Sequence, residues 1–375
     1  MAIQIPSNAE ILTGLREWVE IESQTADVEG VNRAMDAAAA CFESIGAKVG
    51  RILGKEAGFG DCLLVHAPWG GDGPGILILS HLDTVHPRGT LEKLPWRIEG
   101  DRAFGPGTTD MKGGAYLAFA ALQSLVREGK QTPLPLRFLL VSDEEVGSPF
   151  SRSHIECAGE NAKFVLVTEP ARKGGNLITA RNGTARYTIA ARGRAAHSGG
   201  AHKSGRSAIK EIAHQVLALE SQTDYERQLT FNIGRVHGGT SDNTVPEYCT
   251  ARLDVRVASM EDFRYADELV RGLTSNDPDV SLTVNGRLNR PPYRKTEGIQ
   301  KLFDHARSLA REIGFEVKDV ATAGGSDGSL VANKVATLDG LGVRGGGAHT
   351  LHEFLDISSL RPRLALMRRL METLQ

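Results

Sequence analysis

Five short segments of the sequence carry side chains that commonly bind metal ions. They are SHLDTV, GPGTTDMKGG, DEEVGS, VTEP and GAHTLHEF, which supply His81, Asp110, Glu145, Glu169 and His349. Imidazole and carboxylate groups are ligands that zinc accepts. Five protein ligands are too many for one catalytic zinc with an open position, whereas two metal ions bridged by a carboxylate would use them all. The residue types therefore favour a hydrolase with two zinc ions.

Two further acidic residues stand beside these candidates. Asp83 is two residues from His81, so both point to the same side of an extended chain, and Asp83 can support the imidazole as a hydrogen-bond partner. Glu144 and Glu145 follow a strand that we expect to be buried, and beside a metal one could ligate while the other acts as general base. Each segment alone also has an ordinary interpretation, such as a helix cap at Asp110 or a solvated acidic loop at 143–145.

The elements that must position these residues alternate between strands and helices. Short apolar runs at 48–53, 62–66, 75–80, 136–141 and 164–167 predict buried strands, and helical spacing predicts helices from Asn8, at 31–45 and at 111–127. This order predicts an α/β domain with a mostly parallel mixed sheet flanked by helices, in which sites form at the carboxyl ends of strands.

A second kind of pattern interrupts this domain. The predicted order over 181–289 is β-α-β-β-α-β, a compact α+β unit. After Pro291 the α/β pattern returns, with helices at 298–313 and from 358 and a strand near 335–338. We therefore expect a catalytic domain of residues 1–180 and 290–375, and an inserted domain of residues 181–289.

Composition narrows the functional classes. A formal net charge of −2, from 44 basic and 46 acidic side chains, gives no reason to expect nucleic acid or an anionic membrane as a partner. The four cysteines have no CxxC spacing, which argues against a structural zinc site or a disulfide framework. No secretory signal and no run of 18 apolar residues occurs, so we expect a cytoplasmic protein without a membrane span.

The motifs SHLDTV, GPGTTDMKGG, DEEVGS, TEP, RAAHSG and GAHTLHEF, in this order, resemble the di-zinc metallopeptidase family that includes glutamate carboxypeptidase, acetylornithine deacetylase, succinyl-diaminopimelate desuccinylase and aminoacylase. The resemblance runs from about residue 10 to the C-terminus, and the segments RPPY and EFLDISSL are most similar to the glutamate carboxypeptidase branch. It implies two Zn²⁺ per subunit, with Co²⁺ or Mn²⁺ as substitutes, and an inserted lid or dimerisation domain that forms a homodimer.

The resemblance also implies a role for each metal-site residue. Asp110 resembles the bridging carboxylate, followed by a cis peptide bond, and Glu144 stands where the family has its general base. Asp83 resembles the residue that supports a metal-binding histidine. The ligands of one zinc would be His81 and Glu169, and those of the other Glu145 and His349.

Residues of the inserted domain and the joint after it resemble the family's substrate-binding groups. His197 in AAHSG matches a residue that stabilises the oxyanion in a neighbouring active site. Asn243 and Arg290 match residues that hold the substrate carboxylate, although Arg290 could instead be a surface cation beside the prolines. Gly324, Gly325 and Ser326 are expected to line the floor of the substrate pocket.

We therefore predict a metal-dependent hydrolase that cleaves the amide bond of an N-acyl or peptidyl amino acid and releases a C-terminal amino acid such as glutamate. The alternative is an N-acyl amino-acid deacylase of the acetylornithine deacetylase or aminoacylase type. A binding protein that has lost catalysis is disfavoured, because all five ligand positions and Glu144 carry competent side chains. The expected partner is a small-molecule N-acyl amino acid or a short peptide.

Overall fold

The computed structural model describes residues 5–375, and these form two compact units. The first unit runs to Ala180 and also contains Arg294–Ala321 and Ser326–Gln375; the second contains Arg181–Tyr293 and Thr322–Gly325.

The limits of the second unit differ from the sequence-based domain limits at its C-terminal side. Strand β14 (Ser281–Arg290) continues to Arg290, and a backbone bridge then joins Arg181 to Tyr293, so the chain leaves this unit after Tyr293 rather than before residue 290. The segment Thr322–Gly325 also belongs to it, since the Asn182 N–H donates to the Thr322 carbonyl at 2.9 Å.

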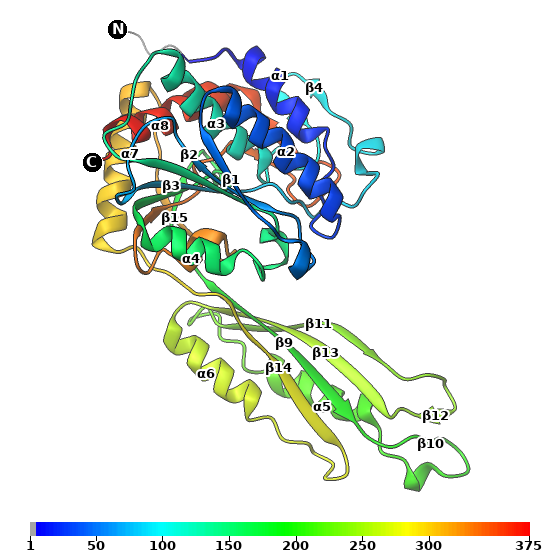
Figure 1. Cartoon of the computed structure of the whole chain (residues 1–375). Coiled ribbons are helices and arrows are strands. Elements are labelled where there is room, and N and C mark those ends of the chain that lie inside the picture. The colour runs from blue at the N-terminus through cyan, green and yellow to red at the C-terminus, as the bar shows by residue number, and fades with distance from the viewer. Residues whose placement is uncertain (1–4) are drawn as a thin grey trace. The chain divides into compact units, whose positions relative to one another are not determined.

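A six-stranded mixed sheet forms the centre of the first unit (Figure 1). Its order is β1-β2-β6-β3-β7-β16; the last four strands are parallel to one another, and β1 and β2 make antiparallel pairs. The bounds are β1 Lys48–Ile52, β2 Cys62–His66, β6 Leu136–Val141, β3 Gly75–His81, β7 Ala162–Val167 and β16 Ala336–Leu338. The predicted α/β class with a mostly parallel mixed sheet is confirmed.

Helices cover both faces of this sheet, which explains why its central strand β3 is buried along its whole length, whereas the edge strand β1 has no buried residue. Along β3, Ile76 and Ile78 belong to the core on one face, whereas Leu77 and Leu79 belong to the core on the other. The helices of the first core are α1 Asn8–Val19, α2 Val28–Ser44, α3 Lys112–Arg127, α7 Glu297–Ile313 and α8 Leu360–Thr373. On the opposite face, α4 (Arg152–Glu160) packs through Ile155.

A small antiparallel sheet lies in the same unit and was not predicted from the sequence. Its order is β17-β18-β5-β4, with bounds β17 Gly345–Gly346, β18 Phe354–Asp356, β5 Arg102–Phe104 and β4 Arg97–Glu99. Strands of two or three residues are too short to show alternation. A further two-stranded pair joins β15 (Asp319–Thr322) to β8 (Leu177–Arg181).

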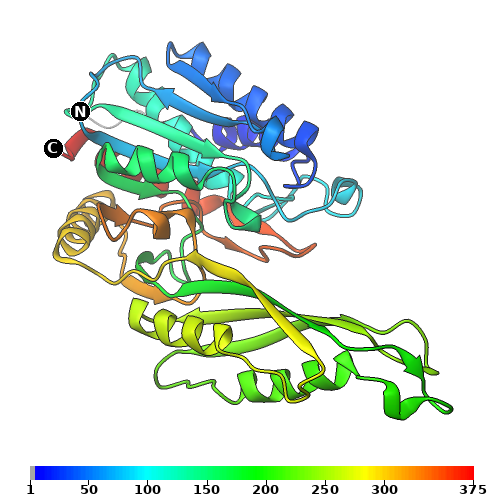
Figure 2. The same cartoon turned by 60° about the horizontal axis from the view of Figure 1, so that its bottom comes forward.

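The second unit is a four-stranded antiparallel sheet with two helices on one face (Figure 2). The strand order is β11-β13-β9-β14, and the core on the covered face takes residues from both helices. The bounds are β9 Gly183–Arg192, α5 Ala208–Glu220, β11 Thr230–Gly238, β13 Tyr248–Val257, α6 Met260–Arg271 and β14 Ser281–Arg290, with a short pair of β10 Ala196–His197 and β12 Thr244–Val245. The predicted β-α-β-β-α-β order is confirmed.

Among the helices formed by residues 5–375, none combines the length and the apolar character that a membrane crossing requires.

Candidate metal centre

Three neighbouring parallel strands end at one edge of the main sheet, and each delivers a residue expected to bind metal. His81 is the last residue of β3, Glu145 lies in the short 3-10 helix Glu144–Val146 after β6, and Glu169 follows β7. Because β3 pairs with both β6 and β7, the three side chains come from adjacent strand ends.

Asp110 is brought to the same place by the first turn of α3. A Cβ atom on Gly114 would lie 2.0 Å from the carbonyl oxygen of Thr168, the residue before Glu169. Only glycine allows so close an approach of the helix to the strand end. The Asp110–Met111 peptide is cis, as the resemblance implied.

The five side chains form two groups that share Asp110. One group is His81, Asp110 and Glu169, the other is Asp110, Glu145 and His349, and in each group the candidate ligand atoms all lie within 4.8 Å of one another. The two oxygens of Asp110 divide between the groups: Oδ1 lies 3.3 Å from His81 Nε2, and Oδ2 lies 3.2 Å from His349 Nε2. This is the arrangement that a bridging carboxylate requires.

The spacing of these atoms fits a metal ion. Ligands placed at about 2.1 Å around a tetrahedral zinc are separated from each other by roughly 3.4 Å. The distance from His349 Nε2 to Glu145 Oε2 is 3.3 Å, and that from His81 Nε2 to Glu169 Oε1 is 3.8 Å. Within residues 5–375, the other Glu145 oxygen, Oε1, is buried and has no hydrogen-bond partner. A buried oxygen of this kind suits metal coordination.

The proton of His81 is fixed by the residue expected to support it. His81 Nδ1 lies 2.9 Å from the main-chain carbonyl of Asp83 and 3.5 Å from its carboxylate. Since a carbonyl only accepts, we place the proton on Nδ1, which leaves the Nε2 lone pair facing Asp110 and Glu169. The carboxylate of Asp83 also accepts the N–H groups of Glu144 and Glu145, both at 3.2 Å.

Burial and neighbouring carboxylates shift the pKa values of several side chains in the site. Burial raises the pKa of Glu145 to about 7, and the negative charge of Asp110 adds to this effect. The Asp110 and Glu145 carboxylates raise the pKa of His349 to about 10. Burial alone would lower the pKa of His81, but Asp110 and Asp83 raise it well above its usual value. Crowded carboxylates with shifted pKa values are typical of a metal site.

His349 lies on the loop between β17 and β18, and its side chain is 53 % exposed. It has a φ of 64°, in the left-handed region that few non-glycine residues adopt. Such a conformation is often found where a side chain must be aimed at a functional site.

Glu353, at the end of the same loop, holds the segment that carries Asp110. Its fully buried carboxylate accepts the N–H groups of Gly107 at 3.0 Å, Thr109 at 2.8 Å and Asp110 at 2.9 Å, and lies 2.7 Å from Nε2 of His86. Pairing of β18 with β5 brings the two loops side by side. Glu353 thereby connects two of the ligand-bearing segments.

In the second unit, the structure brings His197 and Asn243 together. Strand β10 pairs His197 with Thr244, and the Ser198 N–H donates to the Asn243 carbonyl at 2.9 Å. Nδ1 of His197 accepts the backbone N–H groups of Gly199 and Gly200, at 3.1 Å each, so we place the proton of the neutral ring on Nε2. The exposed imidazole can therefore donate a hydrogen bond through Nε2.

Arg290 is buried, with 2 % of its surface exposed, so the surface-cation alternative is wrong. A Cβ on Gly325 would lie 2.8 Å from its Cγ, which shows how closely this glycine packs against the arginine. Gly324 and Gly325 both accept hydrogen bonds from Arg181, at 2.9 and 3.2 Å. Ser326 belongs to the first unit, and its buried hydroxyl donates to an Asp339 oxygen at 2.6 Å.

A family model for the peptidase family M20/M25/M40 matches residues 77–373. The chain belongs to this family. The resemblance to this metallopeptidase family is thereby confirmed, and the protein is a metal-dependent hydrolase of peptide or amide bonds.

Relatives of this M20/M25/M40 peptidase span most of its length. Carboxypeptidase G2 of Pseudomonas sp. (strain RS-16) is 32% identical over 366 residues, covering 96% of this chain and 88% of the relative. Succinyl-diaminopimelate desuccinylase of Dechloromonas aromatica (strain RCB) is 26% identical over 325 residues, covering 80% and 84%. The M20 family metallo-carboxypeptidase Sso-CP2 of Sulfolobus solfataricus superposes with a TM-score of 0.75 at 16% identity, covering 96% and 98%, and shows the shared fold.

The sequence did not single out every residue that shapes this M20/M25/M40 site. Glu353 stands in the GAHTLHEF motif, four residues after His349, but the motif alone did not predict its role, and no pattern indicated His86 or Arg181. A buried charged residue gives no periodic signal in one sequence. The four-residue spacing from His349 to Glu353 in GAHTLHEF was the signal that could have indicated Glu353.

Proposed function

We propose that this protein is a carboxypeptidase-type hydrolase that releases a C-terminal amino acid, with glutamate as first candidate, from an N-acyl or peptidyl precursor. The observation that carries this proposal is the pair of ligand groups that share Asp110. The carboxylate of Glu144, the residue before the proposed ligand Glu145, is the further acidic group of the site. The 32% identity with Carboxypeptidase G2 supports the choice of reaction.

We assign His81 and Glu169 to one zinc ion, Glu145 and His349 to the other, and Asp110 to both. When bound, two zinc ions lower the pKa of a water molecule and polarise the amide carbonyl. Metal analysis of the purified protein should give two ions per chain. A single ion would contradict the assignment.

Glu144 is the proposed general base. It takes a proton from the attacking water and returns it to the leaving nitrogen. Its backbone N–H is fixed by the Asp83 carboxylate, and its negative charge is close enough to act on the pKa of Glu145. Glu145 is the less suitable base, because its Oε2 already lies 3.3 Å from His349.

The test of this assignment is Glu144→Gln. We expect the variant to keep both metal ions and the wild-type unfolding midpoint while kcat falls at least a thousandfold. Glu43→Gln, an exposed change of the same kind on α2, is the matched control and should keep full activity. Unchanged turnover by Glu144→Gln would remove it from the mechanism.

For the second unit, we propose that Nε2 of His197 donates a hydrogen bond to the oxyanion and that Arg290 and Asn243 hold the carboxylate of the amino acid released. Gly324, Gly325 and Ser326 are proposed to line the pocket through their main chains. Replacing Arg290 with lysine keeps the charge but loses the two-pronged geometry, so KM should rise more than kcat falls.

Deacylation of an N-acyl amino acid is the second candidate, supported by the similarity to succinyl-diaminopimelate desuccinylase. Hydrolysis rates on N-acyl-glutamates and on N-acetyl-ornithine, measured with zinc supplied, separate the two. A higher kcat/KM on N-acetyl-ornithine would overturn the carboxypeptidase proposal.

We further propose that residues 181–289 form a homodimer interface, which the resemblance implies. Sedimentation velocity should give the mass of two chains, and a monomer would contradict both the interface and a role for His197 in a partner's site. The cytoplasmic location stays a prediction, to be checked by cell fractionation.

A further inference from the structure

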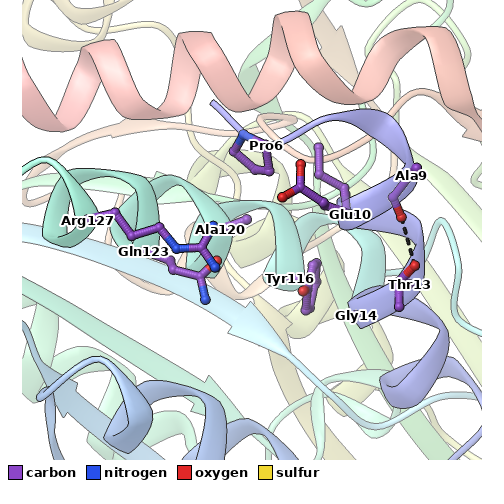
Figure 3. A pocket seen from close by; sticks show the side chains of 10 residues that line it. Pro6, Ala9, Glu10, Thr13, Gly14, Tyr116, Ala120, Gln123 and Arg127 are labelled. Carbon is purple, nitrogen blue, oxygen red and sulfur yellow. Dashed lines mark hydrogen bonds between the residues drawn. The ribbon is translucent and has the colours of Figure 1, made fainter. Parts of the chain in front are cut away.

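Two hollows on the first unit differ in the charges that line them. One, of about 370 Å³, lies between α1 and α3 (Figure 3). It contains both Glu10 and Arg127, whose charges are opposite, and Glu10 already accepts hydrogen bonds from Ser7. None of the proposed metal or substrate residues lines it, and it carries no proposal.

The other hollow, of about 450 Å³, is lined in part by the proposed metal ligand His349. Its wall includes Arg88 and Lys93, both exposed, and no aspartate or glutamate is among its lining residues. Over residues 5–375, neither cation forms an ion pair. The hollow therefore presents two positively charged side chains without an ion pair beside the proposed reaction centre.

The loop that carries these cations is held in one conformation. The Glu22 carboxylate accepts the N–H of Gly89 at 2.8 Å and of Leu91 at 2.9 Å, and the Thr90 hydroxyl donates to the Pro87 carbonyl at 2.6 Å. Glu22 thus stabilises the backbone of the loop. A site whose backbone is already fixed loses less entropy when an anion binds.

Apolar surface adjoins the two cations. Leu351, two residues after His349, is 46 % exposed and lines the hollow together with the half-buried Val85. An exposed leucine here can cover the methylene groups or the ring that connect a carboxylate to the bond being cleaved.

We propose that this hollow is a subsite for a second carboxylate of the substrate, distinct from the carboxylate assigned to Arg290 and Asn243. The inference rests on the proposed function and deepens it: the substrate class is an N-acyl amino acid with two carboxylates. The second carboxylate belongs either to the acyl group or to the side chain of the amino acid released.

Two pairs of compounds distinguish these sources. N-succinyl-leucine and its succinamoyl analogue differ only by a carboxylate in the acyl group, and N-acetyl-glutamate and N-acetyl-glutamine differ only in the side chain released. We expect the zinc-loaded wild type to favour the acidic member of one pair at least tenfold in kcat/KM. This preference should weaken as salt is added.

The test variant is Arg88→Gln combined with Lys93→Gln, and the matched control is Lys55→Gln combined with Lys163→Gln, two exposed lysines outside the hollow. The test variant should lose the tenfold preference because its KM for the acidic compound rises. Its kcat, its metal content and its kcat/KM for the neutral compound should stay within twofold of wild type. The control should keep the preference. Equal preference in wild type and test variant, in both pairs, overturns the subsite.

Binding separates failure of the subsite from failure of the proposed function. Calorimetry on the zinc-loaded Glu144→Gln protein should show tighter binding of the acidic member, and the added Arg88→Gln and Lys93→Gln changes should abolish the difference. If the wild type hydrolyses none of the four compounds, the proposed function fails. The subsite is then judged by the binding difference alone. Equal affinity for the acidic and the neutral member in both pairs overturns it.

Discussion

Replacing Glu353 with glutamine is expected to weaken both the fold and metal binding. One carboxylate oxygen accepts the N–H groups of Thr109 and Asp110, and the other accepts that of Gly107 and contacts His86. The amide of glutamine keeps one accepting oxygen but turns an NH₂ group toward the donors on the other side. At least one buried N–H then loses its partner.

The magnitude follows from these contacts. An orphaned buried donor costs about 1–3 kcal/mol, and the remaining hydrogen bonds lose the added strength of a charged acceptor, so we expect Glu353→Gln to lower the free energy of unfolding by about 2–4 kcal/mol. Because the same N–H groups position Asp110, metal affinity should fall by about tenfold to a hundredfold.

Urea unfolding and zinc titration, both on metal-free protein at pH 7, measure the two effects. Glu316→Gln is the control: Glu316 is 68 % exposed and pairs with Arg311 at 3.1 Å, so its loss should cost less than about 1 kcal/mol. If Glu353→Gln behaves like this control in both measurements, the carboxylate does not hold the Asp110 segment and our reasoning is refuted.

Three further outcomes are expected. Burial lowers the pKa of Lys112 from 10.5 to about 7, so between these pH values the unfolded chain binds more protons than the folded one. The free energy of unfolding therefore rises with pH, by up to about 1.4 kcal/mol per pH unit. Urea unfolding of Lys112→Met at successive pH values should lack this rise. A Cβ on Gly14 would lie 1.8 Å from the Tyr116 hydroxyl, so Gly14→Ala should cost about 1–3 kcal/mol in thermal unfolding, whereas Gly71→Ala, with nothing within 4 Å, should cost little. A chelator should lower the unfolding midpoint and added zinc should restore it; a midpoint that responds to neither contradicts metal binding.

The sequence predicted most of the main sheet because its central strands are buried on both faces. An unbroken apolar run such as 75–79 is a strong signal, and a polar residue at its end, such as His81, then marks the edge where sites form. The meeting of His81, Glu145 and Glu169 could therefore be expected from local patterns. The order of neighbouring strands could not be derived from them.

The parts that were not predicted depend on contacts between distant segments. The sheet that includes β5 and β18 consists of strands too short for periodicity, yet it places Glu353 beside Asp110. The burial of Arg290 likewise depends on how Gly325 packs against it, which the proline-rich local sequence does not reveal.

The position of Glu353 after the second unit in the sequence also affects the order of events during synthesis. Domains fold progressively as the chain leaves the ribosome, N-terminal parts first. His81 and Asp110 are made before the second unit, but Glu353, which secures the Asp110 segment, is made only after it. A nascent chain thus carries an unsecured half of the proposed metal centre until Glu353 has been synthesised.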